Sequence, residues 1–394
     1  MLLGRLVLEW LTQKFELSRG GGAHSVRPME GLRGFAVFLV FLVHYVTLVR
    51  PWVETGSSLS TFASALHTIG NSGVDLFFVL SGYLIYGSLI SRPQQFLRFM
   101  SRRVERIYPA FIVVFVAYVV MSFALPAENK IPGPVSEGLI YLVQNLLLLP
   151  GLFPIQPMIT VAWSLSYEMF YYLAVPLVIK ILALRDRSTI FRVTFFSCVA
   201  GITAIYCGVY GGHVRLIMFI SGILLHEAIY SRCIATPHGF LGLFALVFGL
   251  LATLLPITGS IGSALKISIL FASFFVLCLV CFRDPSVWLA QGFSWTPLRW
   301  LGNMSYSYYL LHGLALKAGF LALALVLPTS NHGYWLFLAL LPTMFILTLF
   351  PTTLLFLTVE RPFSLLPNRT ERTGSESSIN YIATSKKMVK QDVP

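Results

Sequence analysis

The chain has 394 residues; 56% of them are hydrophobic, only 11% are charged, and the formal net charge is +12. Soluble domains carry about a quarter charged residues, so the composition excludes an ordinary soluble enzyme and indicates an integral membrane protein. The basic residues lie mostly at the ends of apolar segments rather than in one cluster, which argues against nucleic acid as a partner.

The first 17 residues are amphipathic. One helical face carries the apolar side chains Leu3, Leu6, Val7, Trp10 and Leu11. This pattern predicts a helix that lies on the inner membrane surface. A run of three glycines at 20–22 follows as a hinge, so we treat 1–26 as a separate amphipathic N-terminal segment. The membrane domain is expected to cover 27–365, and the polar residues 366–394 are expected to form a disordered cytoplasmic tail.

Ten apolar segments follow the N-terminal segment, most of them close to the length that crosses a bilayer. They cover 34–49, 74–91, 108–125, 163–184, 193–210, 215–231, 238–256, 264–282, 304–327 and 334–358. Four of the five cysteines lie within these segments and the fifth lies beside one. None has the spacing of metal ligands, so we expect free thiols and no metal site.

The placement of basic residues predicts the orientation. If the N-terminus is cytoplasmic, most of the 28 Lys and Arg residues lie on the cytoplasmic side, and only Arg50, Lys130 and Arg215 lie on the other. This asymmetry follows the positive-inside rule. The short apolar stretch 138–150 is expected to be interfacial or re-entrant within one long outer segment, 126–162. The sequence therefore predicts an all-α, polytopic membrane helix bundle of about ten transmembrane helices, with both termini in the cytoplasm.

The first span contains an arginine and a histidine. Arg33 is followed by ten uncharged residues and then His44, which helix rise places roughly 16 Å deeper. Ionisable groups at such depth are costly and are candidate functional residues. A neutral imidazole there can accept a proton from a hydroxyl group. The alternatives are an arginine that reaches the interface and a histidine that bonds to a neighbouring helix.

The second span opens with the run GVDLFFVLSGYLI at 73–85. Asp75 is expected near the outer boundary, where its carboxylate can orient an imidazole or hold a sugar hydroxyl. The alternative is an N-terminal helix cap. Ser81 and Gly82 are small residues two turns deeper, and we expect them to serve close helix packing.

Three arginines precede the third span, in the segment SRRVERIYP at 101–109, which we interpret as a cytoplasmic loop. Arg103 and Arg106 are three residues apart and can grip one phosphate group from the same side. The alternative is the ordinary excess of positive charge on the cytoplasmic side.

The fourth span begins with AWSLSYEMFYY at 162–172. Glu168 lies within the apolar span and needs a partner such as Arg215, a histidine or a substrate hydroxyl; the alternative is a structural hydrogen bond. Trp163 and Tyr167 fit an aromatic belt at the membrane interface, and the tryptophan also fits a ring that stacks against a sugar.

The last two spans carry two further polar groups. His312 lies about 13 Å beyond Asn303 by helix rise, at a depth comparable with that of His44, so a second buried histidine favours a polar cavity. Glu360 and Arg361 close the final span, and there we expect a structural ion pair.

Together these motifs resemble the acyltransferase-3 family of integral membrane acyltransferases. The resemblance runs from about Arg27 to Phe363 and rests on the order and spacing of the motifs. These are Arg33-x10-His44, GVDLFFVLSG at 73–82, Arg103-x-x-Arg106 with Tyr108-Pro109, Trp163-Ser164-Leu165-Ser166 with Glu168, LG-x-x-SYS-x-YL-x-H at 301–312, and Glu360-Arg361-Pro362-Phe363.

This resemblance implies an acyl-CoA-dependent O-acyltransferase of the bacterial inner membrane that uses acetyl-CoA or a similar thioester, without a metal. Its acceptor is expected to be a hydroxyl of a surface or exported polysaccharide or glycolipid. The resemblance makes Arg33 and His44 essential and places Arg103 and Arg106 on the donor side. We also expect Arg33 to contact the donor's phosphates, together with Arg103 and Arg106. We further expect Asp75 and Glu168 to serve catalysis, and Trp163, Tyr167 and His312 to contact the acceptor.

Two alternatives stay open at this point. A transporter or flippase of a glycan or small polar solute would use the same buried polar residues as a pathway, without acyl chemistry. An acyltransferase could also act on an amine, or transfer an acyl group other than acetyl.

Overall fold

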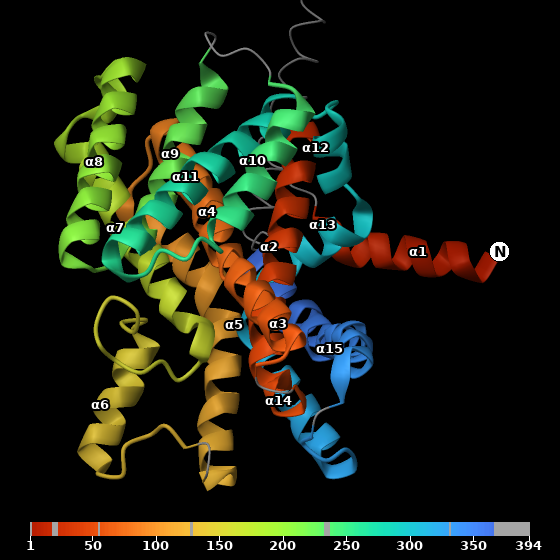
Figure 1. The fold of residues 1–394 in the computed structure, drawn as a ribbon. Helices are drawn as coiled ribbons and strands as arrows, with labels where there is room; N and C mark the ends of the chain where they lie inside the picture. The colour runs from red at the N-terminus through yellow and green to blue at the C-terminus, as the bar shows by residue number, and fades with distance from the viewer. Residues whose placement is uncertain are drawn as a thin grey trace, which may run out of the picture.

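In the computed structural model the chain forms a bundle of helices, described for residues 2–17, 23–53, 56–126, 129–231, 237–330 and 332–365. These ranges contain no β-strand. Figure 1 shows the arrangement of the helices. They are α1 (Leu2–Phe15), α2 (Ala23–Val49), α3 (Ser58–Gly70), α4 (Ser72–Ile90), α5 (Phe96–Ala124), α6 (Val135–Leu146), α7 (Trp163–Ile181), α8 (Thr189–Tyr210), α9 (Ile217–Tyr230), α10 (Gly239–Ala252), α11 (Gly259–Arg283), α12 (Trp288–Phe293), α13 (Thr296–Asn303), α14 (Ser305–Val326) and α15 (Gly333–Leu355), which continues into a π-helical segment, Phe356–Leu365.

The predicted all-α membrane bundle is confirmed. In the described ranges, seven helical segments are long and apolar enough to cross a membrane. They are Arg27–Trp52, Ser58–Ile90, Phe96–Ala124, Thr189–Tyr210, Gly259–Arg283, Ser305–Val326 and Gly333–Leu365. The predicted count of about ten is not confirmed. Two of the predicted spans, α9 and α10, have only 14 residues each, or about 21 Å of helix rise against a hydrocarbon core of about 30 Å.

Two helices differ from the sequence prediction. The arginine-rich segment 101–109 is not a loop, because α5 begins at Phe96 and carries it in its first turns. The region between the first two predicted spans contains α3, whose first turn is capped by the Ser57 hydroxyl accepting a hydrogen bond from the Ser60 amide at 3.1 Å. The arginine-rich segment was missed because polar residues at a helix end look like a loop when only apolar length is measured.

The segment predicted as interfacial or re-entrant forms α6 and an ordered loop. Asn145, at the end of α6, accepts a hydrogen bond from the Met158 amide at 2.7 Å. Lys130 donates to the carbonyl oxygens of Pro157 and Met158, each at 3.1 Å. These contacts tie together the proline-rich connection between α5 and α7.

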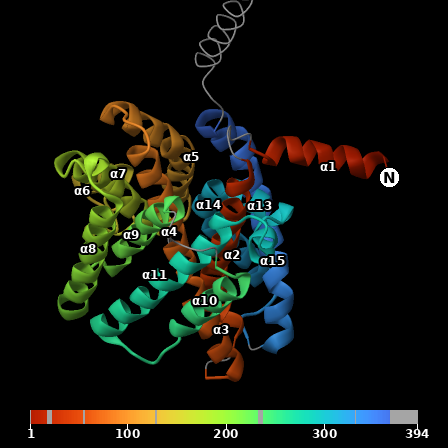
Figure 2. The same ribbon diagram turned by 90° about the horizontal axis from the view of Figure 1, so that it is seen from above.

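Helix α2 lies in the middle of the bundle, in contact with α3, α4, α13 and α14 (Figures 1 and 2). Glycines permit the closest approaches. A Cβ atom on Gly34 would sit 2.0 Å from the carbonyl oxygen of Leu298 in α13. A Cβ atom on Gly82 in α4 would sit 2.0 Å from that of Phe219 in α9. The expected packing role of Gly82 is therefore confirmed, since no larger residue fits there without moving a helix.

Helix α1 extends away from the bundle, and its C-terminal end is anchored (Figures 1 and 2). The Phe15 ring packs against Trp300 and Phe356, with ring centroids 5.8 and 5.6 Å apart. Asn303 donates to the Phe15 carbonyl oxygen at 3.0 Å. The predictions for the glycine hinge at 20–22, for Cys233 and for the tail 366–394 lie outside the described residues. The other four cysteines are free thiols.

Candidate active site

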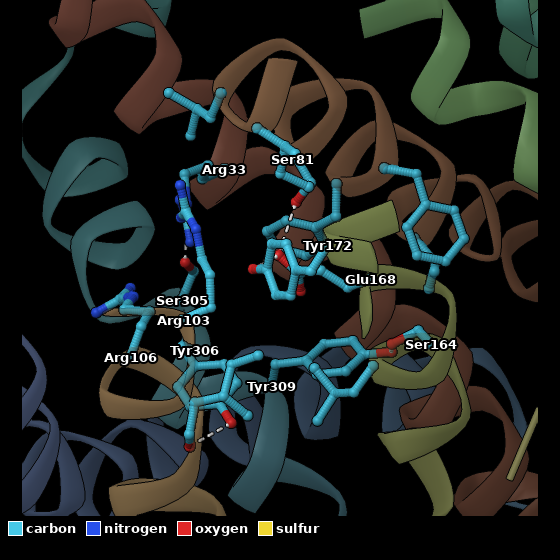
Figure 3. A pocket seen from close by; sticks show the side chains of 17 residues that line it. Arg33, Ser81, Arg103, Arg106, Ser164, Glu168, Tyr172, Ser305, Tyr306 and Tyr309 are labelled. Atoms are coloured by element: carbon cyan, nitrogen blue, oxygen red, sulfur yellow. Dashed lines mark hydrogen bonds between the residues drawn. The ribbon is translucent and has the colours of Figure 1, made fainter. Parts of the chain in front are cut away.

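A polar cavity runs between α2, α4, α5, α7 and α14 and encloses about 800 Å³, its open mouth included. We call it the arginine cavity. Its polar lining residues come from five helices (Figure 3): Arg33, Ser81, Arg103, Arg106, Ser164, Glu168, Tyr172, Ser305, Tyr306 and Tyr309. The lining on α4 runs from Val74 to Ile85, which corresponds to about 16 Å of helix rise. The fold thus brings four predicted site residues, Arg33, Arg103, Arg106 and Glu168, into one elongated space.

Two of the arginines are held by hydroxyl groups and aromatic rings. Arg33 donates through Nε to the Ser305 hydroxyl at 3.2 Å. Arg103 lies over the rings of Phe99 and Tyr172, with Cζ 5.0 and 5.3 Å from their centroids. Such contacts orient a guanidinium group, and both arginines line the cavity.

The third arginine has a carboxylate partner. Arg106 Nη1 lies 2.9 Å from Oε1 of Glu360, a fully buried residue. The other oxygen of Glu360 accepts hydrogen bonds from the amide and hydroxyl of Ser307, at 3.0 and 2.6 Å. The structural ion pair expected at this end of the final span is present: Glu360 pairs with Arg106, whereas Arg361 donates to the Gln13 carbonyl at 3.0 Å. A phosphate group at Arg106 would have to share the guanidinium with Glu360.

Glu168 faces the arginines across the cavity (Figure 3). Its Oε1 accepts hydrogen bonds from the Tyr172 hydroxyl at 2.5 Å and from the Ser81 hydroxyl at 3.3 Å. Arg215, one of the partners expected from the sequence, pairs with Asp75 instead. Ser81 was expected to serve packing alone, and its bond to Glu168 shows that it also belongs to the polar lining.

The two candidate histidines lie next to each other. The ring centroids of His44 and His312 are 4.9 Å apart, with the rings nearly perpendicular. His312 is fully buried and donates through Nδ1 to the Tyr308 carbonyl at 2.8 Å. In the neutral ring Nε2 is then an unprotonated acceptor, and it has no hydrogen-bond partner within the described residues. His44 is partly buried.

Neither histidine lines the arginine cavity itself. One lining residue, Tyr309, contacts the pair: its ring centroid lies 6.2 Å from that of His312. The Tyr309 hydroxyl is 2.8 Å from the Ser164 hydroxyl, which also lines the cavity. The histidine pair therefore adjoins the arginine cavity across the ring of one tyrosine.

Asp75 and Tyr167 line a second cavity, which we call the Asp75 cavity. Asp75 is fully buried in the first turn of α4, with its Oδ1 3.7 Å from Nε of Arg215. It does not cap the helix, since the N-cap residue is Asn71. The Tyr167 hydroxyl is 2.7 Å from Nδ1 of His213. Trp163 lines neither cavity, but its ring lies 5.8 Å from Cζ of Arg215.

Sequence reasoning missed several residues of these sites. Ser305, Tyr306 and Tyr309 line the arginine cavity and belong to the SYS-x-YL motif, so the motif itself was the available signal. Lys266 lines the Asp75 cavity, and its place within an apolar span was the signal there. The described residues contain no group of three or more His, Cys, Asp and Glu side chains placed to hold a metal ion.

The comparisons with known proteins agree with the motifs. Residues 28–361 match the sequence model of the acyltransferase-3 family, described as an acyltransferase domain. The chain is 30% identical over 322 residues to the O-acetyltransferase OatA of Staphylococcus aureus, an alignment that covers 72% of this chain and 49% of that protein. It is 27% identical over 325 residues to the putative peptidoglycan O-acetyltransferase YrhL of Bacillus subtilis, covering 72% of this chain and 47% of that protein.

A shorter alignment to the acyltransferase MdmB of Streptomyces mycarofaciens is 34% identical over 154 residues, 38% of each chain. The chain thus spans about half the length of the OatA and YrhL proteins that it matches. No solved structure is detectably similar to it.

Proposed function

This chain belongs to the acyltransferase-3 family, and we propose that it transfers an acyl group, preferably acetyl, from a cytoplasmic acyl-CoA to a hydroxyl group of a carbohydrate. The acceptor is a cell-surface or exported polysaccharide or glycolipid, and the membrane is the bacterial inner membrane. The observation that carries the proposal is the arginine cavity, in which basic groups and a carboxylate line one elongated space beside a histidine pair. The family match favours this function over a transporter without acyl chemistry.

The donor binds by its charge at the arginine end of the cavity. The phosphates of acyl-CoA pair with Arg33 and Arg103, which both line the cavity. Arg106 contributes while it stays paired with Glu360. Guanidinium groups suit this task because they bind phosphate oxygens through two parallel hydrogen bonds. The pantetheine arm then extends along α4 and α7 towards Tyr309.

His44 acts as the general base of the transfer. It takes the proton of the acceptor hydroxyl while the oxygen attacks the thioester carbonyl, the C–S bond breaks and the thiolate leaves with a proton returned by the imidazolium. His312 supports this step, because its unprotonated Nε2 can accept a hydrogen bond from the His44 ring as that ring becomes charged. Glu168, held by Tyr172 and Ser81, sets the electrostatics of the cavity opposite the arginines.

Mass spectrometry of envelope glycans tests this function most directly. Cells that express the protein should carry glycans heavier by one acyl group than cells without it, and the mass difference identifies the acyl group. Purified protein in nanodiscs should transfer label from [¹⁴C]acetyl-CoA to the same glycan. Unchanged glycans together with glycan movement across vesicles in the absence of acyl-CoA would instead establish a transporter.

A further inference from the structure

The Asp75 cavity is a second, separate polar space. It encloses about 910 Å³, its mouth included, and shares no lining residue with the arginine cavity. The two cavities adjoin each other through a pair of stacked rings: Phe78 lines one, Tyr167 lines the other, and their ring centroids are 5.6 Å apart. A ligand in the Asp75 cavity would therefore lie next to the donor cavity without entering it.

Asp75 is a buried carboxylate with unused hydrogen-bonding capacity. The residue is 0% exposed, and neither carboxylate oxygen accepts a hydrogen bond from a described residue. Its contact with Arg215, at 3.7 Å, is longer than a hydrogen bond. Buried polar groups are nearly always hydrogen-bonded, because leaving one unsatisfied is costly. The two oxygens thus mark a place where ligand hydroxyl groups can donate.

The cations of this cavity outnumber its carboxylate. Arg215 and Lys266 line it together with Asp75 as the one acidic residue. Lys266 lies seven residues into α11, within a span apolar enough to cross a membrane, and no hydrogen bond or ion pair joins it to another described residue. A cation at such a position is expensive unless water or an anion accompanies it.

A turn formed by two glycines places His213 and Arg215 in the lining of the cavity. Gly211 and Gly212 adopt positive φ angles of 78° and 121°, which other residues rarely adopt. The turn ends α8 and brings His213 and Arg215 onto the wall formed by α4 and α7. The cavity therefore combines hydroxyl-accepting oxygens with a surplus of positive charge.

We propose that the Asp75 cavity binds the acceptor and selects an acidic saccharide, one that carries a carboxylate or phosphate group as well as hydroxyl groups. Arg215 and Lys266 pair with the acidic group, and Asp75 accepts hydrogen bonds from the hydroxyls. This inference rests on the proposed function for the role of the bound saccharide as acceptor. Lys266 is a specificity-determining residue that contacts the acidic group and takes no part in the transfer step.

The test measures saccharide binding to the full chain in nanodiscs, without any acyl donor. Three probes of equal length are compared: a neutral gluco-oligosaccharide, its uronic acid form and its 6-phosphate form. Trp163 reports binding by fluorescence, since its ring lies 5.8 Å from Arg215. The acidic probes should bind at least about tenfold more tightly than the neutral one, as expected for hydrogen bonds to charged groups, and their order identifies carboxylate or phosphate as the preferred group.

Variants separate a specific role of Lys266 from a general effect of charge. Lys266→Gln should remove most of the preference for acidic probes, and Lys266→Arg should keep it. Lys317→Gln, which removes a charge from another apolar helix outside both cavities, should leave it unchanged. Equal binding of acidic and neutral probes to the unmodified protein, or an unchanged preference in Lys266→Gln, overturns the inference.

The inference and the proposed function can fail separately. If the acidic probe binds through Lys266 but never receives label from [¹⁴C]acetyl-CoA, the saccharide site stands and the acyltransferase proposal falls. If label passes to neutral and acidic acceptors equally well in Lys266→Gln, the acyltransferase proposal stands and the acidic specificity falls.

Discussion

The arginine cavity and the Asp75 cavity lie on either side of the Phe78–Tyr167 ring pair. They differ in whether their carboxylates have hydrogen-bond partners in the protein. In the arginine cavity the lining carboxylate of Glu168 is held by Tyr172 and Ser81. The lining residue Arg106 pairs with Glu360, which is itself held by Ser307. In the other cavity Asp75 accepts no hydrogen bond from a described residue.

This difference indicates two kinds of site. The arginine cavity is preorganised, because packing and hydrogen bonds fix its polar groups before any ligand binds. The Asp75 cavity leaves polar capacity unused, so its ligand should contribute more of the stabilising contacts. Four experiments test this difference, in order of decreasing expected effect.

The largest effect is expected at the pair of His44 and His312. The donor and the acceptor must both reach this pair for the proposed reaction. His44→Ala should lower acyl transfer by about 10²- to 10⁴-fold, the usual contribution of a general base, while the protein remains in the membrane. His238→Ala, at an exposed position before α10, is the matched control and should retain activity. Normal transfer by His44→Ala would exclude this residue as the base.

The second test concerns the ion pair between Arg106 and Glu360. Arg106→Gln leaves Glu360 buried without its cation, which should cost about 3–5 kcal/mol in the free energy of unfolding. Thermal unfolding in detergent measures this loss. Adding Glu360→Gln should restore part of it, since no uncompensated charge then remains buried. Equal unfolding temperatures for Arg106→Gln and the unmodified protein would show that the pair does not fix the cavity.

The third test separates donor binding from stability. Arg103 lines the cavity and forms no ion pair with a carboxylate of the described residues. Arg103→Gln should raise the apparent KM for acetyl-CoA by about tenfold or more, as expected for a lost charge-assisted hydrogen bond, with little change in kcat. The neighbouring Arg102 is exposed and outside the cavity, so Arg102→Gln should leave KM unchanged.

If Arg103→Gln behaves like Arg102→Gln, the two residues contribute only to the distribution of charge that orients the protein in the membrane. Replacing both Arg103 and Arg106 should raise the donor KM further than Arg103→Gln alone. Comparing this double variant with Arg106→Gln distinguishes phosphate binding from the loss of the Glu360 pair.

The smallest effect is expected at the wall between the cavities. Tyr167→Phe keeps the ring that stacks on Phe78 but removes the hydroxyl bonded to His213. A single hydrogen bond contributes about 0.5–1.5 kcal/mol, so the acceptor KM should rise only about two- to tenfold and the donor KM should not change. Tyr171→Phe, which loses a bond to the Leu216 carbonyl outside both cavities, is the control. A changed donor KM in Tyr167→Phe would contradict the separation of the two sites.

Much of the candidate site was predictable from motifs. Arg33, Arg103, Arg106 and Glu168 were each selected from the sequence and line one cavity. Their partners were not predictable, because partner choice depends on which helix faces meet. Arg215 was one of three partners considered for Glu168 but pairs with Asp75. The ion pair expected around Glu360 is present, and its partner, Arg106, lies on the distant helix α5.

Composition and motifs alone predicted the membrane class, the all-helical fold and the candidate site residues. Composition, apolar length and the placement of charges are local properties, and each can be read from one segment at a time. The division of these residues between two cavities, and the contact of His44 with His312, are visible only in the folded structure. That division depends on close helix crossings such as Gly82 against Phe219, where steric fit between distant segments sets which side chains face each other.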